Sequence, residues 1–291
     1  IDKDEFLRTY LIQRYGSLDE TVFAAWQTLM ASVYENTVNN GGQESIITGR
    51  PNFKVNPGGT TNTKSHYVKG DLIRAWQQLI SCAQTYGESD GFRYDLVDVT
   101  RQVLADYASI LQQKVAAMYK SGNMEGFKAA SEEFLGLVDD MDKLLGTREE
   151  FLLGKWLSDA RNVGHTQQEK DLYEHNARNQ ITLWGNKDCR IRDYACKHWN
   201  GMMSGFYRPR WERFFEVVYK AMEQGEEYDE DSFIRSSKDW EWEWTLGHEE
   251  YLTESVGSEI EECLRIWEKY HQEILKLQDN FEYKEHVAAY V

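Results

Sequence analysis

The chain has 291 residues, of which 41% are hydrophobic and only 3 are proline, so it is long enough to bury a sizeable core. Its net charge is −16, and an acidic surface repels nucleic acid and anionic lipid headgroups, which argues against nucleic-acid and membrane partners. The four cysteines form no CxxC pair, so neither a structural zinc site nor a metal cofactor is indicated.

Amphipathic helices are predicted along most of the chain. The chain begins at Ile1 rather than methionine, which favours a mature or excised segment. Apolar residues recur at spacings of three and four in stripes over Leu18–Val33, Phe92–Met118 and Phe127–Leu144. Strand signals are almost absent. We therefore expect an all-α fold, an irregular bundle of about eight to ten helices that forms one domain over residues 1–291.

Start signals for helices agree with these stripes. A Ser or Thr followed three residues later by Glu is the pattern of a capping box. The three matches are Thr147 with Glu150, Thr166 with Glu169, and Ser258 with Glu261. The last stretch, residues 275–291, continues charged and apolar and is expected to add a final helix.

One long loop interrupts the helical pattern at residues 38–66, which are rich in Asn, Gly, Thr and Ser. A loop of this length inside a domain is usually functional or disordered. It carries the run Arg50-Pro51-Asn52-Phe53 and ends at His66-Tyr67. Loops on a rigid scaffold often carry function, so His66 and Tyr67 are candidates. The alternative is a solvated histidine beside an anchoring tyrosine.

Two shorter breaks follow, at Gly185–Asp188 and near Pro209, where a helix must kink or begin. Trp184 precedes the first break, where its ring either projects into a cleft or closes the core at a helix end. Cys189 and Cys196 lie seven residues apart, and free thiols are favoured over a disulfide.

Seven separated runs, in order over about residues 5–270, resemble the C-terminal domain of α-N-acetylglucosaminidases, glycoside hydrolase family 89. They are Arg14-Tyr15-Gly16, Ala25-Trp26, the segment Phe92–Gln102, the segment Phe151–Leu157, the segment Arg178–Gly185, Asp193-Tyr194-Ala195-Cys196-Lys197 with Trp199 and Gly201, and Tyr207-Arg208-Pro209-Arg210-Trp211.

The resemblance implies an all-helical domain that follows a small N-terminal domain and a TIM-like barrel. It implies an enzyme that removes terminal α-linked N-acetylglucosamine with retention and without a cofactor, using two barrel glutamates. No catalytic residue is then expected in this chain. Its partners are the catalytic barrel of the same polypeptide and an N-acetylglucosamine-terminated glycan, and the parent enzyme is expected to be secreted, periplasmic or lysosome-like.

The resemblance also implies that this domain forms part of the substrate pocket wall. The substrate-binding residues that it implies are Trp184, Tyr194, Ile191, Tyr67 and His66. The sequence departs from the family pattern in this region. His66 stands where an aromatic residue, often Trp, is usual, and Cys196 stands where Asn is usual. These departures bear on substrate preference rather than on the fold.

Two other functional readings stay open. The first is a non-catalytic carbohydrate-binding or protein-interaction module, which is favoured if Trp184, Tyr194 and Tyr67 are buried separately instead of converging on one concave surface. The second is a chain with its own acid and nucleophile, for which Glu174 and Asp193 on either side of Trp184 are candidates. With 49 acidic residues, chance neighbours of this kind are common.

Structural roles are favoured for the remaining motifs. His165 and Glu169 have the i, i+4 spacing of a metal site but lack a third ligand, so no metal is expected. Arg210 is expected to pair with a carboxylate, because a guanidinium fork matches a carboxylate. Trp240, Trp242 and Trp244 are expected to pack on the helical core or on the barrel rather than on oligosaccharide.

Overall fold

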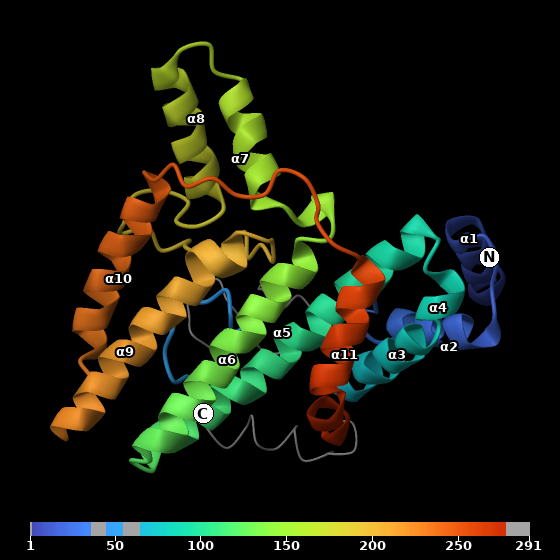
Figure 1. The fold of residues 1–291 in the computed structure, drawn as a ribbon, viewed down its shortest axis with the longest axis horizontal. Helices are drawn as coiled ribbons and strands as arrows, with labels where there is room; N and C mark the ends of the chain where they lie inside the picture. The colour runs from blue at the N-terminus through green and yellow to red at the C-terminus, as the bar shows by residue number, and fades with distance from the viewer. Residues whose placement is uncertain (1, 36–44, 55–64, 278–291) are drawn as a thin grey trace. The chain divides into compact units, whose positions relative to one another are not determined.

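The structure, a computed structural model, describes residues 2–35, 45–54 and 65–277. Within these residues it contains eleven α-helices and no β-strand, which confirms the predicted all-α class (Figure 1). The helix count exceeds the expected range by one because α4 (Ala83–Tyr86) is a single turn. None of the helices described is both long and apolar enough to cross a membrane.

The described helices gather into two compact units. Unit 1 comprises residues 1–40, 64–106 and 257–291, and unit 2 comprises residues 41–63 and 107–256. Helix α5 (Asp90–Lys120) contributes its first half to unit 1 and its second half to unit 2. The single domain over residues 1–291 stays a prediction.

Unit 1 also contains α1 (Lys3–Tyr15), α2 (Glu20–Ala31), α3 (Lys69–Ser81) and α11 (Glu259–Lys276). A buried polar contact ties α1 and α2 to α5. The Arg14 guanidinium and the Tyr15 hydroxyl both donate to the Asp95 carboxylate, at 2.6 and 2.7 Å. The Trp26 indole donates to the Tyr15 hydroxyl at 2.8 Å. Buried polar groups need such partners, and here they fix how the helices cross.

Unit 2 also contains α6 (Met124–Leu145), α7 (Leu153–Asn162), α8 (Gln167–Gln180), α9 (Arg208–Gln224) and α10 (Glu230–Thr245). A 3₁₀ turn, η1 (Glu149–Phe151), precedes α7, and a π-helix, η2 (Met203–Tyr207), precedes α9. Pro209 lies in the first turn of α9, so it begins a helix rather than kinking one.

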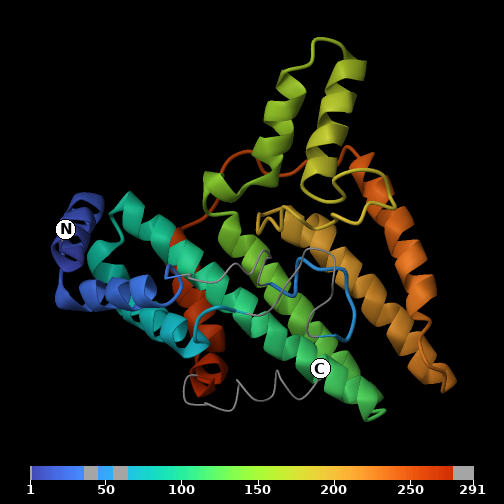
Figure 2. The same cartoon turned by 180° about the vertical axis from the view of Figure 1, so that it is seen from behind.

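Helices α6 and α9 form the centre of unit 2 and lie side by side in both views (Figures 1 and 2). The whole predicted stripe of α6, from Phe127 to Leu144, is buried. Phe134 packs on Trp211 of α9 with ring centroids 4.6 Å apart. Burying one such side chain contributes about 1.5–3 kcal/mol, so the apolar stripe rather than helix propensity holds α6 in place.

The predicted capping boxes fare differently. Thr166 and Glu169 form a complete capping box at the start of α8, and the Ser258 hydroxyl accepts the Glu261 N–H at the start of α11. The prediction at Thr147 is wrong. Its hydroxyl is buried and donates to the Leu144 carbonyl at the end of α6, because the chain here is still satisfying the last carbonyls of that helix.

The long loop predicted at residues 38–66 is described only at 45–54 and 65–66, where it contains no helix or strand. Residues 36–44 and 55–64 lie outside the described residues. Of the stretch predicted to form an extra helix, residues 275–291, the first two residues belong to the last turn of α11. Residues 278–291 lie outside the described part of the chain.

Candidate functional site

Two aromatic rings stand exposed on the loop between α8 and η2. The Trp184 side chain is 44% exposed and the Tyr194 side chain 51% exposed, and their centroids lie 5.2 Å apart at 63°. We call these two rings the aromatic platform. Ile191, on the same loop, is 45% exposed. The structure therefore brings Trp184 and Tyr194 together and favours the projecting-ring interpretation of Trp184 over the core interpretation.

The backbone beneath the platform is strained. Trp184, Asp193 and Cys196 have φ values of 58°, 63° and 42°, and no other non-glycine residue among those described has a positive φ. The left-handed region costs a side chain with a Cβ about 1–2 kcal/mol, and such strain concentrates at functional sites. The surrounding structure must therefore hold this loop in place.

Hydrogen bonds tie the loop to the end of α8. The Trp184 N–H donates to the Asn179 carbonyl at 2.9 Å, and the Asn179 side-chain amide donates to the Gly185 carbonyl at 2.7 Å. The Asp193 N–H donates to the Thr182 carbonyl at 2.7 Å. These bonds hold the backbone on both sides of the platform.

Asp193, the residue immediately before Tyr194, belongs to a buried ionic cluster. The Asp193 carboxylate accepts from Arg210 at 2.9 Å, and Arg210 also donates to Glu241 at 3.2 Å. Arg50 binds Glu241 through two nitrogens, at 3.1 and 2.5 Å. All four side chains are buried. The expected carboxylate partner of Arg210 is thus present and is in fact two carboxylates.

The pKa values of the two carboxylates in this cluster are shifted in opposite directions. Burial raises the pKa of Asp193 above its ordinary value, and the attraction of Arg210 does not fully offset it. Burial also acts on Glu241, but Arg210 and Arg50 outweigh it and hold the Glu241 pKa below its ordinary value. Glu241 is thus the firmly ionised partner of both arginines.

His66 and Tyr67 lie in unit 1, whereas the platform lies in unit 2. The His66 Nε2 is 2.8 Å from the Val33 carbonyl, and the two rings meet at 5.2 Å. The Tyr67 hydroxyl donates to Asp106 and accepts from Gln102, both at 3.0 Å. Both side chains thus make contacts within unit 1, and their substrate-binding role stays a prediction.

The two carboxylates considered as acid and nucleophile, Glu174 and Asp193, both form ion pairs within the chain. Glu174 is buried and accepts from Arg161, from Arg178 at 2.8 and 3.0 Å, and from His248, whose Nδ1 lies 3.0 Å away. Asp193 is buried against Arg210. A general acid must reach its substrate, so these contacts favour structural roles for both carboxylates.

The tryptophans of α10 pack on unit 2. Trp240 and Trp244 both contact Phe206, with ring centroids 5.5 and 4.9 Å apart, and Trp242 contacts His175 with centroids 5.4 Å apart.

The candidate metal ligands have other roles. The Glu169 carboxylate accepts hydrogen bonds from the backbone N–H groups of His165 and Thr166. Among the residues described, no group of three or more His, Cys, Asp or Glu side chains is placed to hold a metal ion. All four cysteines are free thiols.

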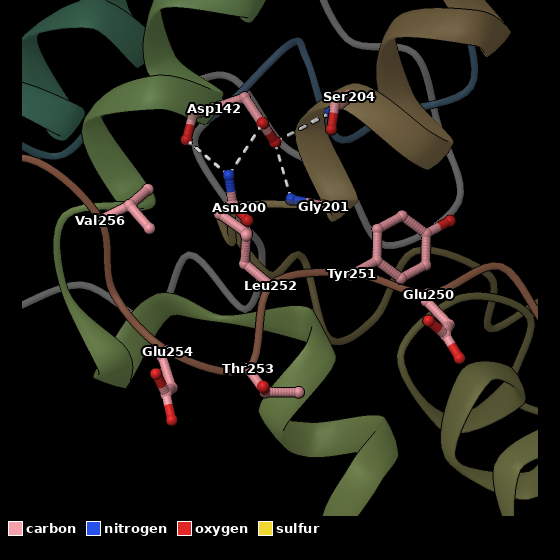
Figure 3. Close-up of a pocket in the computed structure, with 10 residues that line it drawn as sticks. All are labelled: Asp142, Asn200, Gly201, Ser204, Glu250, Tyr251, Leu252, Thr253, Glu254 and Val256. Carbon is pink, nitrogen blue, oxygen red and sulfur yellow. Dashed lines mark hydrogen bonds between the residues drawn. The ribbon is translucent and has the colours of Figure 1, made fainter.

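A pocket of about 610 Å³ lies where the strap, residues 246–256, passes the start of η2 (Figure 3). At its inner end the Asp142 carboxylate accepts from the Gly201 and Ser204 N–H groups and from the Asn200 amide, at 2.7–3.1 Å. Burial raises the pKa of Asp142. This carboxylate caps the π-helix. The platform residues are not part of this pocket, and no sequence pattern indicated it.

Sequence reasoning also missed Arg50 and Glu241 as partners. Arg50 was visible only as part of a loop motif, and Glu241 only as an acidic residue between tryptophans. One signal was available: in α10, Glu241 lies four residues after Ser237 and three before Trp244, on the face that the helix buries.

Comparisons with known proteins place this fold in one class, that of family 89 glycoside hydrolases. Two bacterial structures of that family, from Clostridium perfringens, match 92% of this chain with a TM-score of 0.83 and 28% identity. One is a complex with 2-acetamido-1,2-dideoxynojirimycin, and the other is a variant in complex with its substrate GlcNAc-α-1,4-galactose.

Residues 6–269 match the family described as "Alpha-N-acetylglucosaminidase (NAGLU) C-terminal domain", and the chain belongs to that family. Human α-N-acetylglucosaminidase is 30% identical over 273 residues, which are 93% of this chain. The matched region is 36% of the human protein and 32% and 31% of the bacterial chains, so the chain spans about a third of these relatives. The resemblance drawn from the seven runs is confirmed.

Proposed function

We propose that this chain is the C-terminal part of an α-N-acetylglucosaminidase and that the aromatic platform forms one wall of its sugar pocket. The observation that carries this is the contact between the exposed Trp184 and Tyr194 rings on a strained, tightly bonded loop. An aromatic face covers the apolar C–H surface of a sugar, and a ring held in advance binds at low entropic cost. Complexes of the bacterial relatives contain N-acetylglucosamine-type ligands.

The chemistry is assigned to the catalytic barrel of the same polypeptide. A retaining glycosidase needs one acid/base carboxyl and one nucleophilic carboxyl, about 5 Å apart, on either side of the scissile bond. The described loop instead places Asp193 in a buried ion pair with Arg210. The platform therefore orients the terminal sugar, and the barrel glutamates cleave the bond.

Hydrolysis of an aryl α-N-acetylglucosaminide tests this assignment. The assay compares this chain alone with a longer polypeptide that includes the region matching the barrel of its relatives. We expect turnover only with the longer polypeptide. Turnover by the isolated chain that Glu174→Gln or Asp193→Asn abolishes would contradict the assignment and make those residues the acid and nucleophile.

One alternative is a non-catalytic carbohydrate-binding module, which is favoured because contacts within this chain alone hold the platform. Trp184 and Tyr194 are exposed and held by contacts within unit 2. A module of this kind binds N-acetylglucosamine-terminated oligosaccharide on its own. Calorimetric titration of the isolated chain distinguishes the two functions, because a pocket wall alone binds the sugar too weakly to saturate.

A further inference from the structure

Residues 45–54 form an irregular segment that is buried over residues 45–52. Residues 45–52 all have buried side chains, although the segment contains no helix or strand. Loops normally run over the surface, because a buried loop must find partners for its backbone polar groups. Figure 2 shows this segment in blue beside α6 and α9.

Side chains of the neighbouring helices supply those partners. The Arg210 guanidinium donates to the Thr48 carbonyl at 2.7 Å, and the Trp211 indole donates to the Ile47 carbonyl at 3.0 Å. Further along, the Gln112 amide donates to the Asn52 carbonyl at 2.9 Å. The segment is therefore bound by α9 and the second half of α5 at several points.

The segment also returns one charge to the cluster behind the platform. Arg50 forms a bidentate ion pair with Glu241, and such pairs are strong and geometrically specific. The Nη1 of Arg210 is shared between Glu241, at 3.2 Å, and Asp193, at 2.9 Å. Arg50 neutralises Glu241 and so leaves Arg210 able to hold Asp193.

We propose that Arg50 is a positioning residue for the aromatic platform, acting through Glu241 and Arg210 on Asp193. Asp193 immediately precedes Tyr194 and is held at φ 63°, a conformation that does not persist without outside support. Without Arg50, the buried Glu241 carboxylate keeps the Ser237 hydroxyl and draws Arg210 to itself, which weakens the contact between Arg210 and Asp193. The loop at 181–196 then relaxes toward ordinary backbone angles, and the two rings separate.

Hydrogen exchange on the intact 291-residue chain tests the proposal directly. The Trp184 and Asp193 N–H groups report the loop, because both are bonded to carbonyls near the end of α8. We expect Arg50→Ala to speed their exchange at least about tenfold while amides of α6 keep their protection. Lys54→Ala is the matched control, because Lys54 anchors the same segment to Glu230 through an exposed pair outside the cluster.

A double-mutant cycle shows whether the effect passes through the cluster. Residues of one network have non-additive effects. We therefore expect Arg50→Ala combined with Asp193→Asn to exchange no faster in the loop than Asp193→Asn alone. If Arg50→Ala does not fold, Arg50→Lys, which keeps the charge but loses the bidentate geometry, takes its place in the cycle. Unchanged exchange at Trp184 and Asp193 in the folded variant, or fully additive effects, would overturn the proposal.

The consequence for catalysis rests on the proposed function and is measured separately. In the longer polypeptide, Arg50→Lys should raise KM for the aryl glycoside several-fold and leave kcat nearly unchanged, because the platform binds the sugar without touching the reacting bond. Faster loop exchange with an unchanged KM would leave Arg50 as a positioning residue and would contradict the role of the platform as a sugar-binding wall.

Discussion

At the scale of single residues, Trp184 carries the most information about function. A tryptophan with a positive φ gives up backbone energy, and its ring is neither buried nor needed by the core. Backbone strain beneath an exposed ring is typical of a position where the ring has a functional role. The same loop holds Asp193 and Cys196 in the left-handed region, so the strain is concentrated at the candidate site.

This strain makes a testable difference between two truncations of Trp184. Alanine keeps the left-handed penalty of about 1–2 kcal/mol, whereas glycine avoids it and loses only part of that gain through its freer unfolded state. We expect Trp184→Gly to be about 1 kcal/mol more stable than Trp184→Ala in denaturant unfolding. At Leu172, an exposed position within α8, the order should reverse by a similar amount. A more stable alanine variant at Trp184 would contradict the strain.

At the scale of elements, Glu174 joins α8 to α7 and to the start of the strap. Burial alone raises the pKa of Glu174, but hydrogen bonds from His248, Arg178 and Arg161 outweigh it, and the pKa lies below its ordinary value of 4.5. A lowered pKa in the folded state means that the ionised carboxylate stabilises the fold above pH 4.5 and loses this contribution as the pH falls further.

We therefore expect Glu174→Gln to lower the free energy of unfolding at pH 7 by about 3 kcal/mol, because it removes the buried charged partner of Arg178 and leaves that guanidinium the carbonyl and the exposed carboxylate of Glu249. The deficit should shrink as the pH falls below that ordinary value, since the wild-type carboxyl then loses its charge as well. Asp159→Asn is the control. Its pair with Lys155 is exposed, and its loss should change stability by less than about 0.5 kcal/mol. A deficit that does not depend on pH would contradict the ionic role.

Helical glycines test how the strap is seated on α7. A Cβ on Gly154 would collide with the carbonyl oxygens of Tyr251 and Leu252, which are backbone atoms and cannot move aside. A Cβ on Gly136 in α6 would meet nothing within 4 Å. We expect Gly136→Ala to stabilise the chain by about 0.5–1 kcal/mol and Gly154→Ala to destabilise it by about 1–3 kcal/mol in thermal or denaturant unfolding. Equal effects would show that the strap does not press on α7.

The elements of the fold were largely predictable, because an apolar stripe such as that of α6 and a capping box such as that of Thr166 are local signals. The contacts behind the platform were not. Arg50 and Glu241 lie 191 residues apart in the sequence, and nothing local says which of 49 acidic residues an arginine will meet. The error at Thr147 has a different, local origin, because a hydroxyl between two helices can complete the preceding one instead of starting the next.

At the scale of the whole molecule, the family match at residues 6–269 runs through both units. Unit 2 presents the platform and contains the buried segment 45–54, whereas unit 1 contains His66 and Tyr67. Trp184 and Tyr194 are in direct ring contact, and the substrate-binding roles of Ile191, His66 and Tyr67 stay predictions. We propose that the Trp184–Tyr194 pair binds the terminal sugar in the longer polypeptide.

The most direct test is steady-state hydrolysis by that polypeptide with Trp184→Ala, against Tyr173→Ala as an exposed aromatic residue of α8 away from the platform. We predict that Trp184→Ala raises KM about tenfold, equivalent to about 1.4 kcal/mol of lost sugar binding, while Tyr173→Ala changes nothing. Equal KM values for the wild type and both variants would contradict the account.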